Sequence, residues 1–150
     1  MEKHDGLGGF LEPQGYRRID LKKSAIGHFE VEAKLNGQKV VMIVDTGAPQ
    51  TVLDMTAARD MGLPDEGPCG DGKAIGAGGE VSTSRTSIDE LILEPISTGL
   101  RSLPVVDLNH CNVELEKLGA RRISGVIGGD VLFAKSAVLE FASGALYLKE

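Results

Sequence analysis

In the stretch VVMIVDTGAPQTVLD (Val40–Asp54), five apolar residues run directly into the tripeptide Asp-Thr-Gly. The apolar run has the composition of a buried β-strand, so Asp45 follows a central strand. A carboxylate at the end of such a strand is unfavourable unless it is paired, hydrogen-bonded or used in chemistry. Asp45 is therefore either a turn residue that bonds its own backbone or a residue with a chemical function.

The residues that flank this stretch predict a mainly β domain. HFEVEAKL, residues 28–35, alternates between apolar and polar residues, and Asn-Gly then supplies the tight turn of a hairpin. Further strands are predicted over residues 80–87, 88–93 and 100–106, and SAVLEF and ALYLK form a terminal hairpin. Pro104 indicates that the strand over 100–106 lies at an edge or contains a bulge.

Two short helices are predicted between the strands. One covers Met55–Met61, with Asp54 as its N-cap. The other covers residues 108–118 and is bounded by Asp107 as the cap and Gly119 as the stop.

Length and charge limit the classes of function. A chain of 150 residues that is 41% hydrophobic can build one domain with its own core. The net charge of −6 argues against a nucleic-acid or anionic-membrane surface. No apolar run approaches the roughly 18 residues of a membrane span, and the N-terminus lacks the apolar core of a signal peptide. We expect a cytoplasmic protein, unless the chain is a piece of a larger or anchored one.

Cysteine and histidine give no metal or cofactor prediction. Cys69 and Cys111 do not form a C-x-x-C pair, and no histidines stand at ligand spacing beside them. The neighbours His110 and Cys111 raise the possibility of a cysteine nucleophile, but sequence neighbours are rarely the pair that meets in space. Cys111 also falls on a helical stripe of apolar residues, with Leu108, Leu115 and Leu118, which favours a core position.

The order of the motifs resembles the retroviral-type, or retropepsin-like, aspartic proteases. VVMIVDTGA resembles their catalytic strand and loop, and GVIGGDVL resembles the segment that crosses behind this loop. AIGAGGEVSTS, residues 74–84, lies where that family carries its flap. A helix placed before GVIGGDVL makes the chain similar to the retroviral-like domains of cellular, including bacterial, proteins. The resemblance extends over Gly27–Lys149.

This resemblance implies a closed or barrel-like β domain with one or two short helices. We expect that domain over residues 16–150 and a flexible N-terminal extension over residues 1–15, for which the family offers no counterpart. The resemblance also assigns site residues in three groups. The catalytic residue is Asp45, with loop support from Thr46, Gly47 and Ala48; the flap is Ile75, Gly76, Ala77, Gly78 and Gly79; the crossing segment is Val126, Ile127 and Gly128.

The chemistry of such a site requires two carboxylates. One activates a water molecule while the other carries a proton to the carbonyl oxygen, and two like charges at this distance cannot both ionise. The sequence contains a single Asp-Thr-Gly and no Asp-Ser-Gly. The resemblance therefore implies a homodimer that acts on a peptide or protein substrate and needs no cofactor or metal.

Alternatives stay open at this point. The chain is either a homodimeric aspartic endopeptidase or a catalytically silent relative that keeps the fold as a dimerisation or peptide-binding module. An intact Asp45 favours the enzyme, whereas Pro49 replaces the serine or threonine that the family often has there. AIGAGGE also fits a plain mobile loop, and a phosphate loop is disfavoured because no Gly-Lys-Ser/Thr follows. Asp130 is interpreted as a helix cap in preference to a catalyst.

Overall fold

A long antiparallel hairpin carries the catalytic-loop candidate. The computed structural model describes residues 6–76 and 79–150. Strands β3 (Phe29–Leu35) and β4 (Gln38–Val44) pair along their whole lengths. Asn36 and Gly37 join them with φ angles of 50° and 83°, the left-handed conformation that a tight hairpin turn requires. The predicted Asn-Gly hairpin is confirmed, and it delivers Asp45 to the end of β4.

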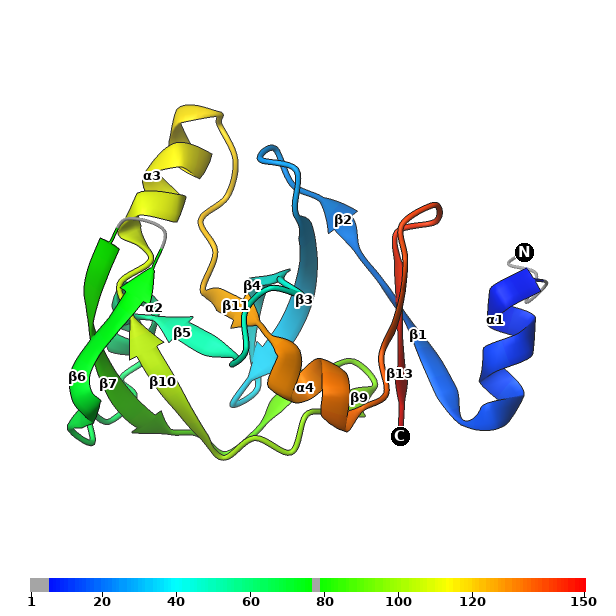
Figure 1. Ribbon diagram of the computed structural model, residues 1–150, viewed down its shortest axis with the longest axis horizontal. Coiled ribbons are helices and arrows are strands. Elements are labelled where there is room, and N and C mark those ends of the chain that lie inside the picture. The colour runs from blue at the N-terminus through cyan, green and yellow to red at the C-terminus, as the bar shows by residue number, and fades with distance from the viewer. Residues whose placement is uncertain (1–5, 77–78) are drawn as a thin grey trace.

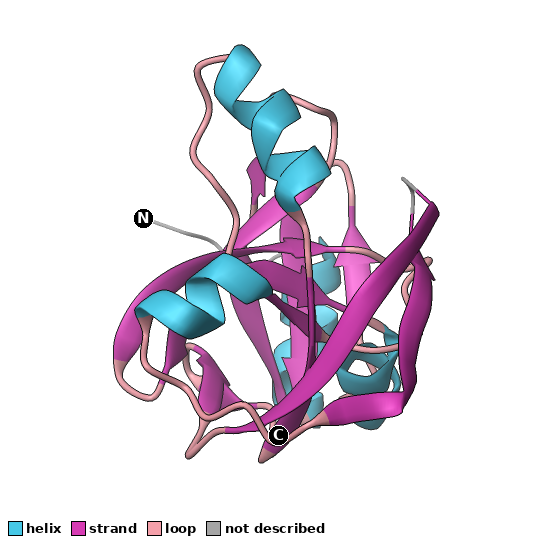
Figure 2. Ribbon diagram, turned by 90° about the vertical axis from the view of Figure 1, so that its left-hand side faces the viewer, coloured by secondary structure: helices cyan, strands magenta, loops and turns pink. Residues whose placement is uncertain are grey.

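Most strands belong to one ten-stranded sheet that curls around its core (Figures 1 and 2). The sheet's order is β6-β7-β10-β5-β11-β4-β3-β8-β9, with β2 paired to β3. The strands not yet bounded are β2 (Lys22–Lys23), β5 (Val52–Asp54), β6 (Pro68–Gly76), β7 (Gly79–Ser87), β8 (Leu91–Leu93), β9 (Ile96–Ser97), β10 (Ser102–Val106) and β11 (Gly125–Ile127). Fully buried side chains such as Met42, Leu53 and Ile127 form the core inside the curl. The prediction of a mainly β, barrel-like domain with short helices is confirmed.

A separate three-stranded sheet contains the chain ends. Strand β13 (Ala145–Lys149) lies between β1 (Tyr16–Asp20) and β12 (Val138–Glu140), antiparallel to both. The predicted terminal hairpin is thus present as β12 and β13. The short helix α1 (Gly6–Leu11) and the 3₁₀ turn η1 (Glu12–Gln14) precede β1, and Figure 1 shows α1 at the outer side of this sheet.

Residues 6–14 are packed against the rest of the chain. Leu11 is buried in a small cluster with Ala145 and Tyr147 of β13. The Tyr147 side chain is 1% exposed, so α1 closes the outer face of the terminal sheet. The expectation that residues 1–15 form a flexible extension stays a prediction, and the packing of Leu11 gives it a direct test.

Three more helices connect strands. They are α2 (Met55–Asp60), α3 (Asn109–Lys117) and α4 (Gly129–Ala134). The predicted cap of α2 is confirmed, because Ala57 donates its backbone N–H to Asp54 Oδ2 at 3.3 Å. The predicted cap of α3 is wrong by one residue: Leu108 is the N-cap and has no side-chain cap bond, whereas Asp107 Oδ1 accepts the N–H of Asn109 at 2.8 Å from just outside the helix. In the part of the chain that the structure describes, no helix has the length and apolar character needed to cross a membrane.

The structure differs from the predicted elements in three places. The strand expected over residues 88–93 begins only at Leu91, because the N–H groups of Asp89 and Glu90 bond the Asn36 side chain instead. Strand β10 lies inside the sheet and not at its edge; β5 pairs with it only from Val105 onward, which leaves Pro104 beside a single neighbour. Leu118 is 57% exposed, since the helical stripe ends where α3 ends.

Candidate active site

Asp45 lies in a tight loop that its own backbone closes. Its N–H donates to the carbonyl of Ile127 at 3.0 Å, and its carbonyl accepts the N–H of Ala48 at 3.2 Å. The N–H of Gly47 donates to Asp45 Oδ1 at 2.8 Å. A Cβ at Gly47 would lie 3.3 Å from that oxygen, so glycine suits this close approach. The carboxylate is consequently fixed at the mouth of the loop.

One oxygen of this carboxylate is left for chemistry. The bond from Gly47 to Oδ1 also occurs in ordinary Asx turns, so it does not by itself separate a turn residue from a catalytic one. Within residues 6–76 and 79–150, no hydrogen bond to Asp45 Oδ2 is found, and the residue is partly exposed. An aspartate at the end of a buried strand with one oxygen turned to its surroundings can accept a proton from water.

The segment Val126–Gly128 lies directly beside β4, the strand that Asp45 follows. Strand β11 pairs in parallel with β4, with Val126 opposite Ile43 and Ile127 opposite Val44. Gly128 follows, and a Cβ there would lie 2.5 Å from the carbonyl oxygen of Gln50 and 2.8 Å from that of Ala48. Since real Cβ atoms do not approach backbone so closely, only glycine fits this position. The structure therefore places Val126, Ile127 and Gly128 next to the Asp45 loop.

Three successive N–H groups of this segment hold the loop from behind. Gly128 donates to Thr51 Oγ1 at 3.1 Å, Gly129 to the carbonyl of Ala48 at 2.7 Å, and Asp130 to the carbonyl of Pro49 at 3.1 Å. Proline lacks an N–H but keeps its carbonyl, so Pro49 takes full part in this attachment. The end of the loop is thereby anchored through backbone atoms.

Asp130 and Thr51 form a buried link that the sequence did not reveal. Asp130 Oδ1 accepts bonds from the Thr51 N–H at 2.9 Å, the Thr51 hydroxyl at 2.7 Å and the Val131 N–H at 2.8 Å. The prediction that Asp130 caps a helix is wrong, because the N-cap of α4 is Gly128 and Asp130 lies inside the first turn, where it accepts the N–H of its neighbour Val131. Thr51 is 0% exposed. The only feature of the sequence that could have pointed to this contact is the polar Thr51 directly before the apolar pair Val52-Leu53.

Thr46 has a different environment from its neighbours. Its side chain is exposed, and in the described residues its hydroxyl has no hydrogen-bond partner. Together with Leu132, Phe133 and Leu139, Thr46 lines an apolar cavity of about 220 Å³. Gly129, whose N–H anchors the loop, lines the same cavity.

The predicted flap falls on the hairpin of β6 and β7. In its register Ile75 pairs with Glu80, and Gly76 with Gly79, so these residues lie at the hairpin's end. Ala77 and Gly78 lie outside the described residues. Figure 2 shows the two strands projecting along one side of the molecule. The role of the five residues as a flap is taken up below as part of the proposed function.

His110 and Cys111 do meet, contrary to the expectation for sequence neighbours. Cys111 Sγ lies 3.4 Å from His110 Nε2. Burial first, and then the charges of Asp45 and Asp54, raise the pKa of the Cys111 thiol. A raised pKa lowers the thiolate fraction, which is the opposite of what a cysteine nucleophile needs.

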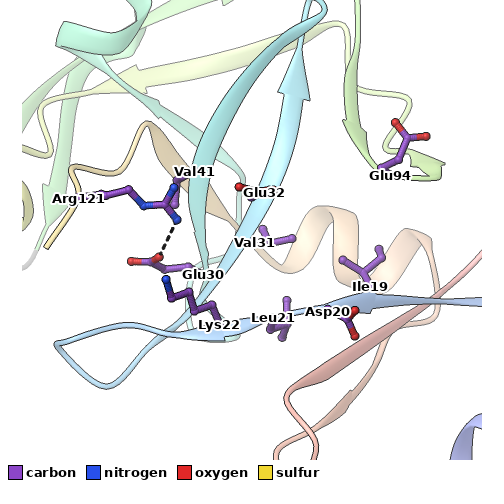
Figure 3. A pocket seen from close by; sticks show the side chains of 10 residues that line it. All are labelled: Ile19, Asp20, Leu21, Lys22, Glu30, Val31, Glu32, Val41, Glu94 and Arg121. Carbon is purple, nitrogen blue, oxygen red and sulfur yellow. Dashed lines mark ion pairs between the residues drawn. The ribbon is translucent and has the colours of Figure 1, made fainter. Parts of the chain in front are cut away.

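A larger cavity, of about 470 Å³, is lined by none of the residues of the Asp45 loop (Figure 3). The Glu30 side chain is 8% exposed there and pairs with Arg121 at 3.6 Å. Figure 3 shows the two side chains pointing toward one another.

No group of three or more potential metal ligands occurs among the residues that the structure describes.

The fold is similar to that of several solved structures. A retropepsin-like aspartic protease from Rickettsia conorii superposes with a TM-score of 0.57 at 19% identity, over 89% of this chain and 98% of that one. EIAV protease in complex with the inhibitor HBY-793 gives 0.56 at 18%, over 80% and 99%. The retroviral protease-like domain of Ddi1 from Leishmania major gives 0.54 at 17%, over 81% and 87%. These similarities establish the retropepsin-like fold.

Sequence comparison gives a second, independent finding. An uncharacterized protein in the cobV 5' region of a Sinorhizobium species is 36% identical over 52 residues, which is 35% of this chain. The chain spans only 22% of the length of that curated relative. Residues 31–131 match the family described as aspartyl protease. This match covers more than half of the chain and includes Asp45 and the crossing segment, so the chain belongs to the aspartyl protease family.

Proposed function

We propose that this chain is an aspartic endopeptidase that works as a symmetric homodimer. Its catalytic dyad consists of Asp45 and the Asp45 of a second copy, placed on either side of a two-fold axis. The observation that carries the proposal is the loop geometry: the Asp45 carboxylate is held by Gly47 at one oxygen and is open at the other among the described residues. The single Asp-Thr-Gly of the sequence makes a second copy necessary.

The dyad hydrolyses a peptide bond without a covalent intermediate. One carboxylate takes a proton from water as the water oxygen attacks the carbonyl carbon, and the protonated partner gives its proton to the carbonyl oxygen. The first carboxyl then donates its new proton to the nitrogen as the C–N bond breaks. The second carboxylate recovers a proton from the collapsing diol, so the pair ends with one proton, as it began.

Neighbouring residues support this chemistry. The Thr46 hydroxyl bonds across the two-fold axis to the loop of the other copy, which accounts for its exposure in a single chain. An extended peptide lies between the two loops and the β6–β7 hairpins, whose end residues Ile75, Gly76 and Gly79 act as the flap. Ala77 and Gly78 complete the flap by their position in the sequence.

A dyad within one chain is disfavoured by the contacts of Asp130. This aspartate follows the crossing segment closely, but its Oδ1 already accepts three hydrogen bonds from Thr51 and Val131. An oxygen that already accepts three donors of its own chain is not free to bind the attacking water or the substrate carbonyl. Asp130 therefore holds the loop, and the second catalytic carboxylate comes from another copy.

Digestion of a mixed peptide library tests the proposal. The wild type and Asp45→Asn are compared by mass spectrometry, because the amide is nearly isosteric and cannot exchange the proton. Asp45→Asn is expected to abolish cleavage without changing the melting temperature. Asp60→Asn, an exposed aspartate at the end of α2, is the matched control and is expected to cleave like the wild type. Equal cleavage by wild type and Asp45→Asn would refute the assignment.

A further inference from the structure

The C-terminal strand β13 is paired inside one chain along its whole length on one side and over residues 145–147 on the other. On one side of β13, Tyr16 lies opposite Lys149 and Asp20 opposite Ala145. On the other side, β12 pairs with it from Val138 to Glu140. A strand has two hydrogen-bonding edges, so β13 has none to offer to another chain over this length.

Both faces of this terminal sheet are covered as well. Tyr147 lies under α1 in a cluster with Leu11. Leu146 and Leu148, which point to the opposite face, are fully buried in the main core. The sheet is therefore a finished part of a single chain, and a partner that replaced β1 or β13 would have to open buried contacts first.

A different surface beside this sheet is open. Within the described residues, β12 pairs with β13 only, so its outer edge is free. Leu139 of β12 lines the cavity of about 220 Å³ that also contains Thr46. The adjacent Phe133 of α4 is 89% exposed. We call Thr46, Phe133, Leu139 and the outer edge of β12 the α4–β12 face; Figure 1 shows α4 between the main sheet and the terminal sheet.

We propose that the α4–β12 face is the dimer interface and that the two copies associate there without exchanging β1 or β13. The proposal rests on the function proposed above, which requires a second Asp45 next to the first. Because Thr46 is the neighbour of Asp45, a copy that brings its own Asp45 close must approach this face. In a two-fold dimer both copies use the same face. The Phe133 ring of each copy is the aromatic anchor that fills the apolar cavity of the other copy.

A disulfide between β1 and β13 distinguishes this arrangement from strand exchange. Leu21 N donates to the Gly144 carbonyl and Glu150 N to the Gly15 carbonyl, so those pairs are hydrogen-bonded and the alternate pair Tyr16–Lys149 is not. Cα atoms of such a pair lie about 4.5 Å apart, within disulfide range. The variant carries Tyr16→Cys and Lys149→Cys in a background with Cys69→Ala and Cys111→Ala.

The oxidised variant is analysed by non-reducing denaturing electrophoresis and by sedimentation. We expect a single-chain band on the gel, together with a dimer in solution whose dissociation constant equals that of the reduced protein. Strand exchange would instead link the new thiol on β1 of one copy to the new thiol on the other copy's β13. The resulting covalent dimer on the gel would overturn the proposal, and loss of the dimer on oxidation would overturn it too.

Substitution of the anchor provides an independent test. Phe133→Glu is expected to raise the dimer dissociation constant about 30-fold or more, as for a central aromatic residue of an interface. Phe10→Glu is the control, because Phe10 of α1 is also exposed, at 67%. This variant should leave the dimer dissociation constant unchanged. An unchanged constant for Phe133→Glu, in a protein that dimerises and cleaves, would overturn this interface alone. Cleavage by a protein that stays monomeric would overturn the proposed function as well.

Discussion

At the scale of single residues, the Asp45 loop depends on space as much as on hydrogen bonds. Gly128 lies so close to Gln50 and Ala48 that any side chain there would displace the loop that carries Asp45. Its neighbour Gly129 has more room, because the nearest atom to an added Cβ would be the Ala48 oxygen at 3.4 Å. Two adjacent glycines thus have different tolerances, and only one of them is required by contact.

This difference predicts the effects of two alanine substitutions. Gly128→Ala is expected to lower the free energy of unfolding by about 3 kcal/mol, since backbone must move to admit the methyl group. Gly129→Ala, at the first position of α4, is expected to change it by less than about 1 kcal/mol. Urea denaturation of both variants measures the two values. Similar changes in the free energy of unfolding for the two variants would mean that close contact with the loop does not restrict position 128 to glycine.

The Asp130–Thr51 link gives a second prediction at this scale. Asp130→Ala would leave the buried N–H and hydroxyl of Thr51 without their acceptor, so we expect a loss of about 2–4 kcal/mol in the free energy of unfolding. Asp130→Asn keeps a carbonyl oxygen that can accept the same bonds, and it should fold and cleave peptides nearly as well as the wild type. Complete loss of cleavage in a stably folded Asp130→Asn would make Asp130 a catalytic residue.

At the scale of elements, the sequence predicted the local structure where turn and cap residues are decisive. The Asn36-Gly37 turn, the Asp54 cap and the terminal hairpin follow from short-range chemistry, and all three are present. The pairing of strands that are far apart in the sequence was harder to predict. The interior place of β10 depends on β5 joining it at Val105, which no local pattern around Pro104 encodes.

The candidate site also contains some residues that could be predicted from the sequence and others that could not. The resemblance to the retropepsin-like proteases, which the order of Asp-Thr-Gly and Val-Ile-Gly carries, predicted that Gly128 lies close to the Asp45 loop. Thr51 and Asp130 are 79 residues apart, and neither stands in a recognisable pattern. Their contact becomes visible only once β4, β5 and β11 are assembled.

Helix α1 gives a prediction for an element that the family resemblance did not cover. Leu11 is 6% exposed, whereas Phe10 on the same helix is 67% exposed. If α1 is docked on β13, Leu11→Ala should lower the free energy of unfolding by about 2–3 kcal/mol, and Phe10→Ala by less than about 0.5 kcal/mol. Thermal or urea unfolding measures both. Negligible effects of both variants would support the expectation of a flexible segment over residues 1–15.

At the scale of the whole molecule, the proposed site belongs to no single chain. The proposed two-fold assembly requires three features of each copy, and all three are present: one Asp-Thr-Gly per sequence, an exposed Thr46 and an open α4–β12 face. The assembly in turn makes activity depend on protein concentration, because a dissociated copy holds only one carboxylate of the dyad. Specific activity is expected to fall when the protein is diluted through the dimer dissociation constant measured by sedimentation.

Mixing wild type with the inactive variant Asp45→Asn tests the shared dyad without dilution. When wild type is equilibrated with a nine-fold excess of Asp45→Asn, random pairing leaves about one tenth of the wild-type copies in wild-type dimers, so activity per wild-type copy should fall about ten-fold. The double variant Asp45→Asn/Phe133→Glu is the control, because a copy that cannot dock should not interfere. Native mass spectrometry verifies that subunits have exchanged. If exchange is complete and activity still follows the amount of wild type alone, each chain acts by itself and the shared dyad is wrong.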